Sequence, residues 1–192
     1  MKPKVRKTLH KLYNETGRQK VIETLFKYPD KEFSLSDLAR EAGVAKANIG
    51  KILEQLYNLG MIELTKLTKI WRIMANVQNP AYIKFKIIYN LSIVCQSGLV
   101  DFLNDHFKNP KAIVLFGSFR KGEDITGSDI DIAIEMDSQK EYTTAEWEFD
   151  QLKAVIDRKI QVHLFNRKNV DINVFNNIAN GIVLSGFLEV RP

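Results

Sequence analysis

The sequence predicts an α+β chain with a mainly helical front half and a back half built on a small sheet. Three observations lead to this prediction. Apolar residues recur at helical spacing between residues 18 and 60. Two short runs rich in Ile, Leu, Thr and Trp follow within 61–74 and indicate a hairpin. The apolar run Ala112–Phe116 then indicates a buried strand.

The net charge of +5 is unevenly distributed along the chain. Residues 1–75 contain 15 Lys and Arg against 8 Asp and Glu, whereas residues 76–192 contain 13 against 15. A basic front half suits a polyanion such as DNA, because cationic side chains near phosphates release condensed counterions. The same charges could instead belong to a well-solvated surface that binds nothing. Charge alone does not distinguish the two, so the order of apolar and capping residues has to be considered.

Cysteine content and hydropathy indicate the compartment. Cys95 is the single cysteine, so no intrachain disulfide can form, and a reducing compartment is expected. No stretch approaches the roughly 20 apolar residues that span a bilayer. We therefore expect a cytoplasmic protein without membrane contact.

The first two helices are predicted from apolar spacing and capping residues. The pattern over residues 5–28, interrupted by Gly17, predicts the first helix. Ser34 as N-cap, with Asp37 at the third helical position, forms an acidic capping box. The second helix is short and stops at Gly43.

A third helix and a hairpin complete the front half. Ile49, Ile52, Leu53 and Leu56 define an amphipathic helix, and Gly60 suits the position just after its end. The runs 61–65 and 69–74, separated by a short polar turn, then read as the two strands of a hairpin.

This order resembles a winged helix-turn-helix domain over residues 18–76. The resemblance is carried by Ala39, Gly43, Val44, Ile49 and Leu53, followed by Leu59, Gly60, Met61 and Ile62. Ala45 departs from the Ser or Thr that often caps the recognition helix, a loss of about 1 kcal/mol of helix stability.

The resemblance implies DNA binding, with base edges read from the recognition helix and backbone phosphates met by the wing. A winged helix used for protein contact or dimerisation is the alternative. The implied DNA-binding residues are Lys46, Asn48, Lys51, Lys66, Lys69 and Arg72.

Two linking helices are expected after the hairpin. Pro80 suits the first turn of a helix, and the strongly apolar stretch 81–107 is divided by Gly98. The first linking helix is apolar on several sides, so it could pack between two modules or against a second chain. We expect a homodimer, with a helix buried within its own chain as the alternative.

A phosphate-binding loop is predicted directly after the strand 112–116. Gly117 allows close backbone approach to a ligand, and Ser118 offers a hydroxyl and an amide at a helix start. Arg120 and Lys121 add positive charge one turn later. Alone, this is a weak signal.

The stretch Ser128–Ile134 strengthens it. As a strand, it projects Asp129 and Asp131 from one face and three isoleucines from the other. Two adjacent carboxylates suit Mg²⁺ or Mn²⁺ carrying a nucleoside triphosphate.

The stretch Gly117–Asp131 resembles the signature of the minimal nucleotidyltransferases of the DNA polymerase β superfamily, and the resemblance covers about residues 108–190. It implies transfer of a nucleoside monophosphate from an NTP to an acceptor hydroxyl. In that chemistry Asp129 and Asp131 are the catalytic, metal-binding residues. The implied nucleotide-binding residues are Gly117, Ser118, Arg120, Lys121 and Ser128.

A third carboxylate, usual in active members of the family, is not evident. A helix predicted at about 144–157 leads to a strand at 159–165, whose polar side carries Gln161 and His163. His163 is a further candidate ligand, better suited to Mn²⁺ or Zn²⁺ than to Mg²⁺. Other carboxylates could substitute, and these are Glu123, Asp124, Asp150 and Asp157.

The remaining sequence, from 172, predicts a helix, a strand, a Ser-Gly turn and a last strand. The expected domains are a winged helix-turn-helix at 1–78, linking helices at 79–107 and a nucleotidyltransferase fold at 108–192, with a small mixed sheet flanked by helices.

Three functions remain open. The first is a nucleotidyltransferase coupled to DNA binding. The second is a transcription regulator whose degenerate transferase domain senses a nucleotide. The third is an antitoxin-like protein that pairs with a toxin-type partner protein.

Overall fold

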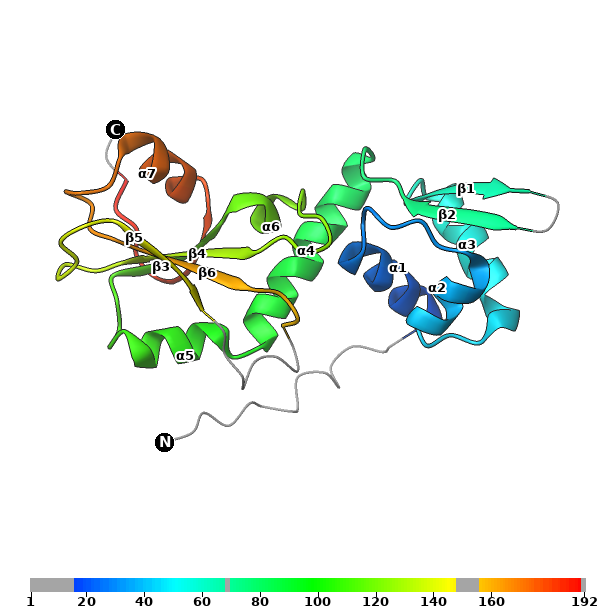
Figure 1. Ribbon diagram of the computed structural model, residues 1–192, viewed down its shortest axis with the longest axis horizontal. Coiled ribbons are helices and arrows are strands. Elements are labelled where there is room, and N and C mark those ends of the chain that lie inside the picture. Colours follow the sequence, from blue (N-terminus) through cyan, green and yellow to red (C-terminus); the bar gives the residue numbers. More distant parts are fainter. Residues whose placement is uncertain (1–15, 68–69, 148–155, 191–192) are drawn as a thin grey trace. The chain divides into compact units, whose positions relative to one another are not determined.

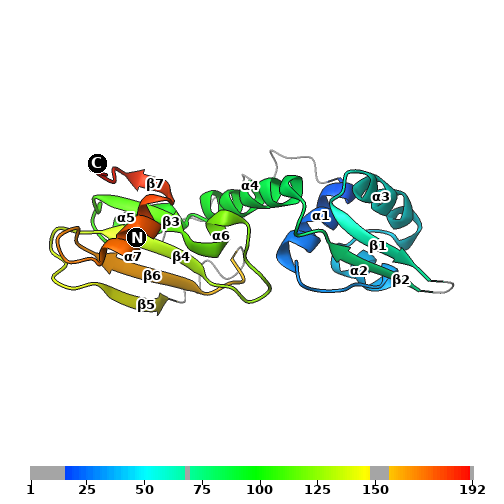
Figure 2. The ribbon, with the colours of Figure 1, turned by 90° about the horizontal axis from the view of Figure 1, so that it is seen from above.

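The computed structural model describes residues 16–67, 70–147 and 156–190. These residues form two compact units (Figures 1 and 2). The N-terminal unit contains the described residues up to Tyr89 together with Glu123–Thr126. The C-terminal unit contains Asn90–Gly122 and the described residues from Gly127 onward. Each unit has its own apolar core.

Three helices and a hairpin make up most of the N-terminal unit. The elements are α1 (Gly17–Lys27), α2 (Leu35–Glu41), α3 (Lys46–Asn58), β1 (Ile62–Lys66) and β2 (Trp71–Ala75). The two strands pair antiparallel, which confirms the predicted hairpin. The order of elements is the expected one, and the winged helix-turn-helix identity stays a prediction.

Local capping sets the helix starts. The Ser34 hydroxyl accepts a hydrogen bond from the Asp37 amide at 3.1 Å, which confirms Ser34 as the N-cap. The same hydroxyl donates to Oδ2 of Asp37 at 2.7 Å, and the reciprocal half of the capping box stays a prediction. Gly17 begins α1 rather than interrupting a longer helix, because the side chain of Thr16 caps this start. The portion of the predicted first helix before Thr16 lies outside the described residues.

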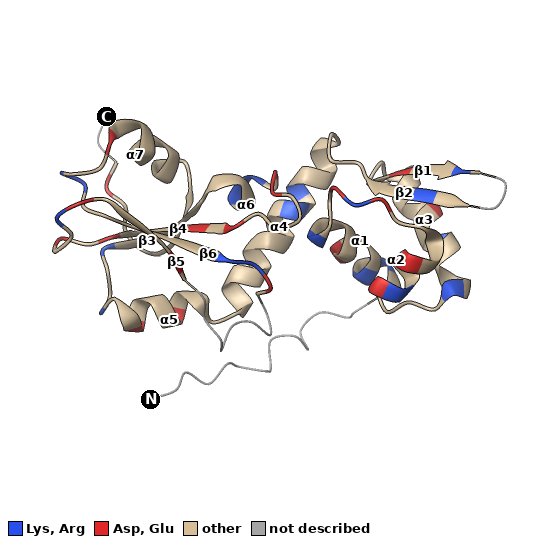
Figure 3. Ribbon diagram, viewed as in Figure 1, with Lys and Arg blue, Asp and Glu red and all other residues tan. Residues whose placement is uncertain are grey.

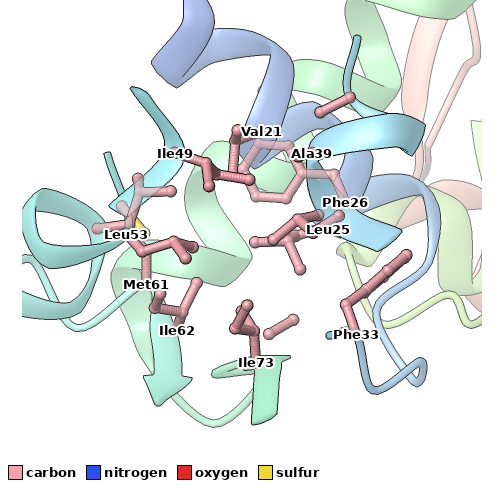
Figure 4. Close-up of a cluster of buried hydrophobic side chains, with 14 of the residues drawn as sticks. Val21, Leu25, Phe26, Phe33, Ala39, Ile49, Leu53, Met61, Ile62 and Ile73 are labelled. Carbon is pink, nitrogen blue, oxygen red and sulfur yellow. The ribbon is translucent and has the colours of Figure 1, made fainter. Parts of the chain in front are cut away.

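The apolar face of α3 closes the core of this unit. Ile49, Leu53 and Leu56 are buried, as their spacing predicted. Figure 4 shows Leu25, Ile49, Leu53 and Ile73 converging from the helices and the hairpin. The opposite face of α3 is left to solvent.

Helices α4 (Pro80–Gln96) and α5 (Leu99–His106) follow the hairpin, and Gly98 separates them with a φ of +79°. This confirms the predicted division. On α4, Tyr82 is fully buried and donates a hydrogen bond to the Leu25 carbonyl at 2.8 Å. The homodimer stays a prediction.

The C-terminal unit is built on a mixed five-stranded sheet of order β5-β6-β4-β3-β7. Its strands are β3 (Ala112–Phe116), β4 (Ile130–Glu135), β5 (Thr143–Trp147), β6 (Ile160–Phe165) and β7 (Ile182–Gly186). Only β4 and β6 are parallel, and the other pairs are antiparallel. The structure confirms the small mixed sheet that the sequence predicted.

The two faces of this sheet are covered by different helices (Figure 1). Ile113, Ile132 and Val162 belong to the face that packs against α5. Val114 and Ala133 belong to the other face, where α7 (Ile172–Ala179) supplies its apolar side. Because strand residues alternate between faces, Asp131 and His163 lie on the same face as Ala133.

The helix predicted at about 144–157 is wrong in its first part. Residues 143–147 form the edge strand β5, which pairs with β6. Residues 148–155, including Asp150, lie outside the described part of the chain. Asp157 lies in an irregular segment before β6 rather than on a helix. Two β-branched threonines begin β5, and pairing with β6 outweighed the irregular apolar spacing on which the prediction rested.

The predicted last strand is also wrong. The chain is irregular after Gly186, which turns with a φ of +75°. One ladder-like bond remains, from the Phe187 amide to the Lys111 carbonyl at 2.8 Å. Leu188 is buried, so apolar contact holds this segment together with that bond, without a continuous strand ladder.

Candidate active site

Gly117 stands where β3 ends and the short helix α6 (Gly117–Lys121) begins. Its φ is +75°, a conformation that side chains rarely adopt. A Cβ at this position would lie 2.1 Å from Oδ2 of Asp131. Glycine is therefore required here on two grounds, because both the backbone angle and the adjacent carboxylate exclude a side chain.

Asp131 lies at the centre of the sheet. It is directly opposite Phe116 on β3 and opposite Gln161 on β6. Asp129 immediately precedes the first residue of β4 and is half-buried. The sheet therefore brings Asp131 to the Gly117 turn, the pair that the sequence motif associated.

His163 is the other polar group against Asp131. Its Nε2 lies 3.3 Å from Oδ1 of Asp131, and its Nδ1 lies 2.5 Å from the Tyr142 hydroxyl. The ring also meets the Phe116 ring edge-on at 4.8 Å between centroids. Sequence reasoning missed Tyr142, because nothing local in the chain connects it to β6.

Positive charge gathers on α6, next to the acidic start of β4 (Figure 3). Nε of Arg120 is buried, and no acceptor among the described residues bonds to it. Lys121 is exposed, and Ser118 is half-buried. A buried guanidinium nitrogen without an acceptor is the kind of donor that a phosphate oxygen satisfies.

Ser128 is held by a residue that the sequence analysis did not single out. Nη1 of Arg158 donates to the Ser128 carbonyl at 3.1 Å. The same guanidinium lies over the Phe119 ring, 5.6 Å from its centroid. Arg158 thus connects the chain entering β6 to α6 and to the residue before Asp129.

The segment Glu123–Thr126 between the two halves of the motif is anchored within the N-terminal unit. Lys86 and Asp124 are each only 1% exposed, and Nζ of Lys86 lies 3.1 Å from Oδ1 of Asp124. Lys86 also donates to the Asp124 carbonyl. The carboxylate of Asp124, considered above as a substitute ligand, is therefore engaged by a buried ammonium.

A second contact holds the same segment. Asp30 accepts hydrogen bonds from the Thr126 amide at 2.9 Å and from the Thr126 hydroxyl at 2.5 Å. The hydroxyl bond is the main reason that the pKa of Asp30 lies below its ordinary value. Glu135 lies on the same face of β4 as Asp131, and burial raises the pKa of its carboxyl group above the ordinary value.

The neighbouring strands offer no third carboxylate beside Asp131. Gln161 occupies the opposing position on β6, and Glu146 follows on β5, where Lys159 pairs with it at 2.8 Å. Among the residues that the structure describes, no group of three or more His, Cys, Asp or Glu is arranged to hold a metal.

The residues present nevertheless fit a hard cation bound together with a triphosphate. Two carboxylates supply oxygen ligands of the kind that Mg²⁺ or Mn²⁺ prefers, and substrate phosphates commonly supply others. Gly117 has no side chain, so a ligand can approach the backbone beside Oδ2 of Asp131. Nε of Arg120 has no acceptor among the described residues, so it can donate to a phosphate oxygen.

The candidate DNA-binding residues fall into separate groups. Lys46, Asn48 and Lys51 are exposed on α3. Lys66 is 3.4 Å from Glu54 and lies over the Trp71 ring.

Arg72 of the hairpin is 2.6 Å from Glu32, so this cation already has an acidic neighbour. Lys69 lies outside the described residues. The exposed cations of α3 are therefore the better-defined candidates.

A comparison with known protein families matches the part of the sequence that forms the candidate site. Residues 98–186 match the polymerase beta nucleotidyltransferase family. The match spans β3 to β7 and contains the Gly117 turn and both aspartates, but it covers less than half of the chain. The C-terminal unit is therefore similar to this family over the stretch that holds the candidate site.

Other comparisons add little. The solved structures that match include the crystal structure of the transcriptional regulator PA4135, at 17% identity and a TM-score of 0.32. That match covers 54% of this chain and 84% of the other, and a likeness this loose carries no argument about function. No curated protein matches the chain. Among the described residues, no helix is both long and apolar enough to cross a bilayer.

Proposed function

We propose that this protein is a nucleotidyltransferase that moves a nucleoside monophosphate from an NTP to an acceptor hydroxyl and that is coupled to DNA binding. The observation that carries the proposal is the pairing of Gly117 with Asp131. A glycine turn that admits no Cβ lies against one oxygen of the carboxylate, within a stretch that matches the nucleotidyltransferase family.

The proposed reaction forms a bond between the acceptor oxygen and the α-phosphorus and breaks the bond to the bridging oxygen, so pyrophosphate leaves. The acceptor hydroxyl gives up its proton to solvent water as the new bond forms. A divalent cation held by Asp129 and Asp131 would supply charge neutralisation for the triphosphate and acidify the acceptor hydroxyl. The backbone at Gly117 and Ser118 binds the phosphates, and Arg120 donates from its buried Nε.

The test is calorimetric titration of each NTP with Mg²⁺ or Mn²⁺. Wild type is compared with the variant Asp129→Asn/Asp131→Asn, which keeps side-chain size and removes both charges. We expect metal-dependent binding that the variant loses. A second assay follows radiolabel from the bound NTP into protein, nucleic acid or small molecules. If the wild-type chain binds no NTP with either metal, the proposal fails.

A second function is favoured by Gln161. This neutral side chain stands opposite Asp131, where an acidic residue would complete a catalytic set. A site with two carboxylates can bind a metal-nucleotide complex and turn over poorly, which suits a transcription regulator that senses nucleotide. Binding in the calorimeter without transfer, together with a change in DNA affinity on adding NTP and metal, would support this function over the first.

DNA binding is proposed for α3. Its exposed face carries Lys46, Asn48 and Lys51, while its other face is buried in the core. No acidic residue lies in its first turn, where DNA phosphates would approach. Asn can pair with adenine through two hydrogen bonds, and Lys can reach guanine or phosphate. The salt dependence of duplex binding in variants of Lys46 and Lys51 tests this role of α3.

A further inference from the structure

His163 is a buried polar residue with a defined hydrogen-bond partner on each ring nitrogen. It is 9% exposed and lies on β6, between β5 and β4 in the sheet of the C-terminal unit. Tyr142 contacts Nδ1, Asp131 contacts Nε2, and the ring rests against Phe116. A histidine packed in this way has one orientation available to it.

The two hydrogen bonds together specify where the ring proton lies. A carboxylate accepts hydrogen bonds and donates none, so Nε2 of His163 has to carry the hydrogen that meets Oδ1 of Asp131. The hydroxyl of Tyr142 can then donate to the lone pair of Nδ1. In a histidine, the bond that one nitrogen makes fixes the protonation of the other.

We propose that Tyr142 and His163 are positioning residues that hold Asp131 by Oδ1 and so present Oδ2, beside Gly117, to the cation. This inference rests on the proposed function. His163 then serves as a hydrogen-bond donor, which differs from the ligand role considered from the sequence. Because Nε2 has no lone pair to offer, the site selects hard cations with oxygen ligands and gives Zn²⁺ no advantage.

The arrangement also compensates for Gln161. Asp131 has no acidic neighbour across β6 to fix its orientation through a shared cation. A hydrogen bond from His163 fixes it through the protein instead. Hydrogen bonds behind a metal ligand commonly change metal affinity by about 10-fold to 100-fold when they are removed.

The first test needs neither nucleotide nor metal. Nitrogen NMR of the full chain labelled with ¹⁵N-histidine reports which ring nitrogen carries hydrogen, and a His163→Gln spectrum assigns the signal among the three histidines. We expect hydrogen on Nε2 in wild type. In Tyr142→Phe we expect a mixture, because Nδ1 loses its donor. A bare Nε2 in the wild-type protein would overturn the proposal.

The second test measures Mn²⁺-NTP affinity. We expect His163→Leu to weaken binding about tenfold, and His163→Gln to recover most of it, since the Gln amide can still donate toward Asp131. His106→Gln, the same change at an exposed histidine, should leave binding unchanged. Thermal unfolding of each variant checks that it is folded.

The outcomes separate this inference from the proposed function. Tighter wild-type binding with Zn²⁺ than with Mn²⁺, lost in His163→Gln, would show His163 to be a ligand and would overturn the inference. If wild type binds no NTP with any metal while Nε2 carries the hydrogen, the proposed function fails and the Tyr142–His163–Asp131 hydrogen-bond chain stands.

Discussion

At the scale of single residues, the carboxylate of Asp131 is the central group of the candidate site. One of its oxygens would be only 2.1 Å from a Cβ at Gly117, and the other is 3.3 Å from Nε2 of His163. The carboxylate is therefore constrained from two sides, by a glycine of its own sequence motif and by a histidine 32 positions away. We expect cation binding at Asp131 to depend on both constraints, and each can be altered alone.

Substitution Gly117→Ala tests the first constraint. The new methyl group would collide with Oδ2, and the positive φ costs roughly 1–2 kcal/mol for a residue with a side chain. We expect a modest loss of stability in urea unfolding and loss of NTP binding in the calorimeter. Gly98→Ala is the matched control, because Gly98 has a φ of +79° and no atom within 4 Å of an added Cβ. Equal loss of NTP binding in both variants would contradict a specific role for Gly117.

At the scale of elements, the segment Glu123–Thr126 is held by residues of the N-terminal unit. It connects α6 to β4, yet its contacts group it with the N-terminal unit. A buried ion pair with Lys86 and two hydrogen bonds to Asp30 hold it. The connector inside the Gly117–Asp131 motif is thus fixed by residues from α4 and from the turn after α1.

Substitution Lys86→Met tests this attachment. It leaves the buried carboxylate of Asp124 without its ammonium, a change that typically costs about 3–5 kcal/mol. We expect a loss of that size in urea unfolding. The double variant Lys86→Met/Asp124→Leu, which removes both charges, should recover most of it. Lys84→Met, an exposed lysine on the same helix, is the control and should change stability little. A double variant as unstable as the single one would contradict the ion-pair explanation.

At the scale of the whole molecule, charge is divided between the two halves of the chain. The front half is basic, whereas the back half has a slight acidic excess. A polyanion would therefore be attracted to the front half, where α3 exposes Lys46 and Lys51. Nothing in this asymmetry identifies a DNA sequence, since phosphate contacts position a protein without reading bases.

The salt dependence of duplex binding tests this role. Each Lys that meets a phosphate adds about one to the slope of log affinity against log salt concentration. We expect Lys46→Gln and Lys51→Gln each to weaken binding, measured by fluorescence anisotropy, and to lower the slope by about one. Lys168→Gln, an exposed lysine of the C-terminal unit, should leave both unchanged. Slopes unchanged in the α3 variants would exclude α3 as the DNA-binding face.

Features that depend on neighbours along the chain could be predicted from the pattern of amino acids alone. Ser34 and Asp37 fixed a helix start, Gly98 separated two helices, and the alternation around Ile132 identified β4. The Gly117–Asp131 motif also identified most of the candidate site, because its residues lie close together in the chain.

Contacts between segments that are distant in the chain became known from the folded protein. Strand β5 was predicted as part of a helix, since an exposed edge strand becomes regular only by pairing with β6. The contacts of Tyr142 with His163 and of His163 with Asp131 join residues 21 and 32 positions apart. No local period records such contacts, because hydrogen bonding across the sheet and burial against its helices create them when the chain folds.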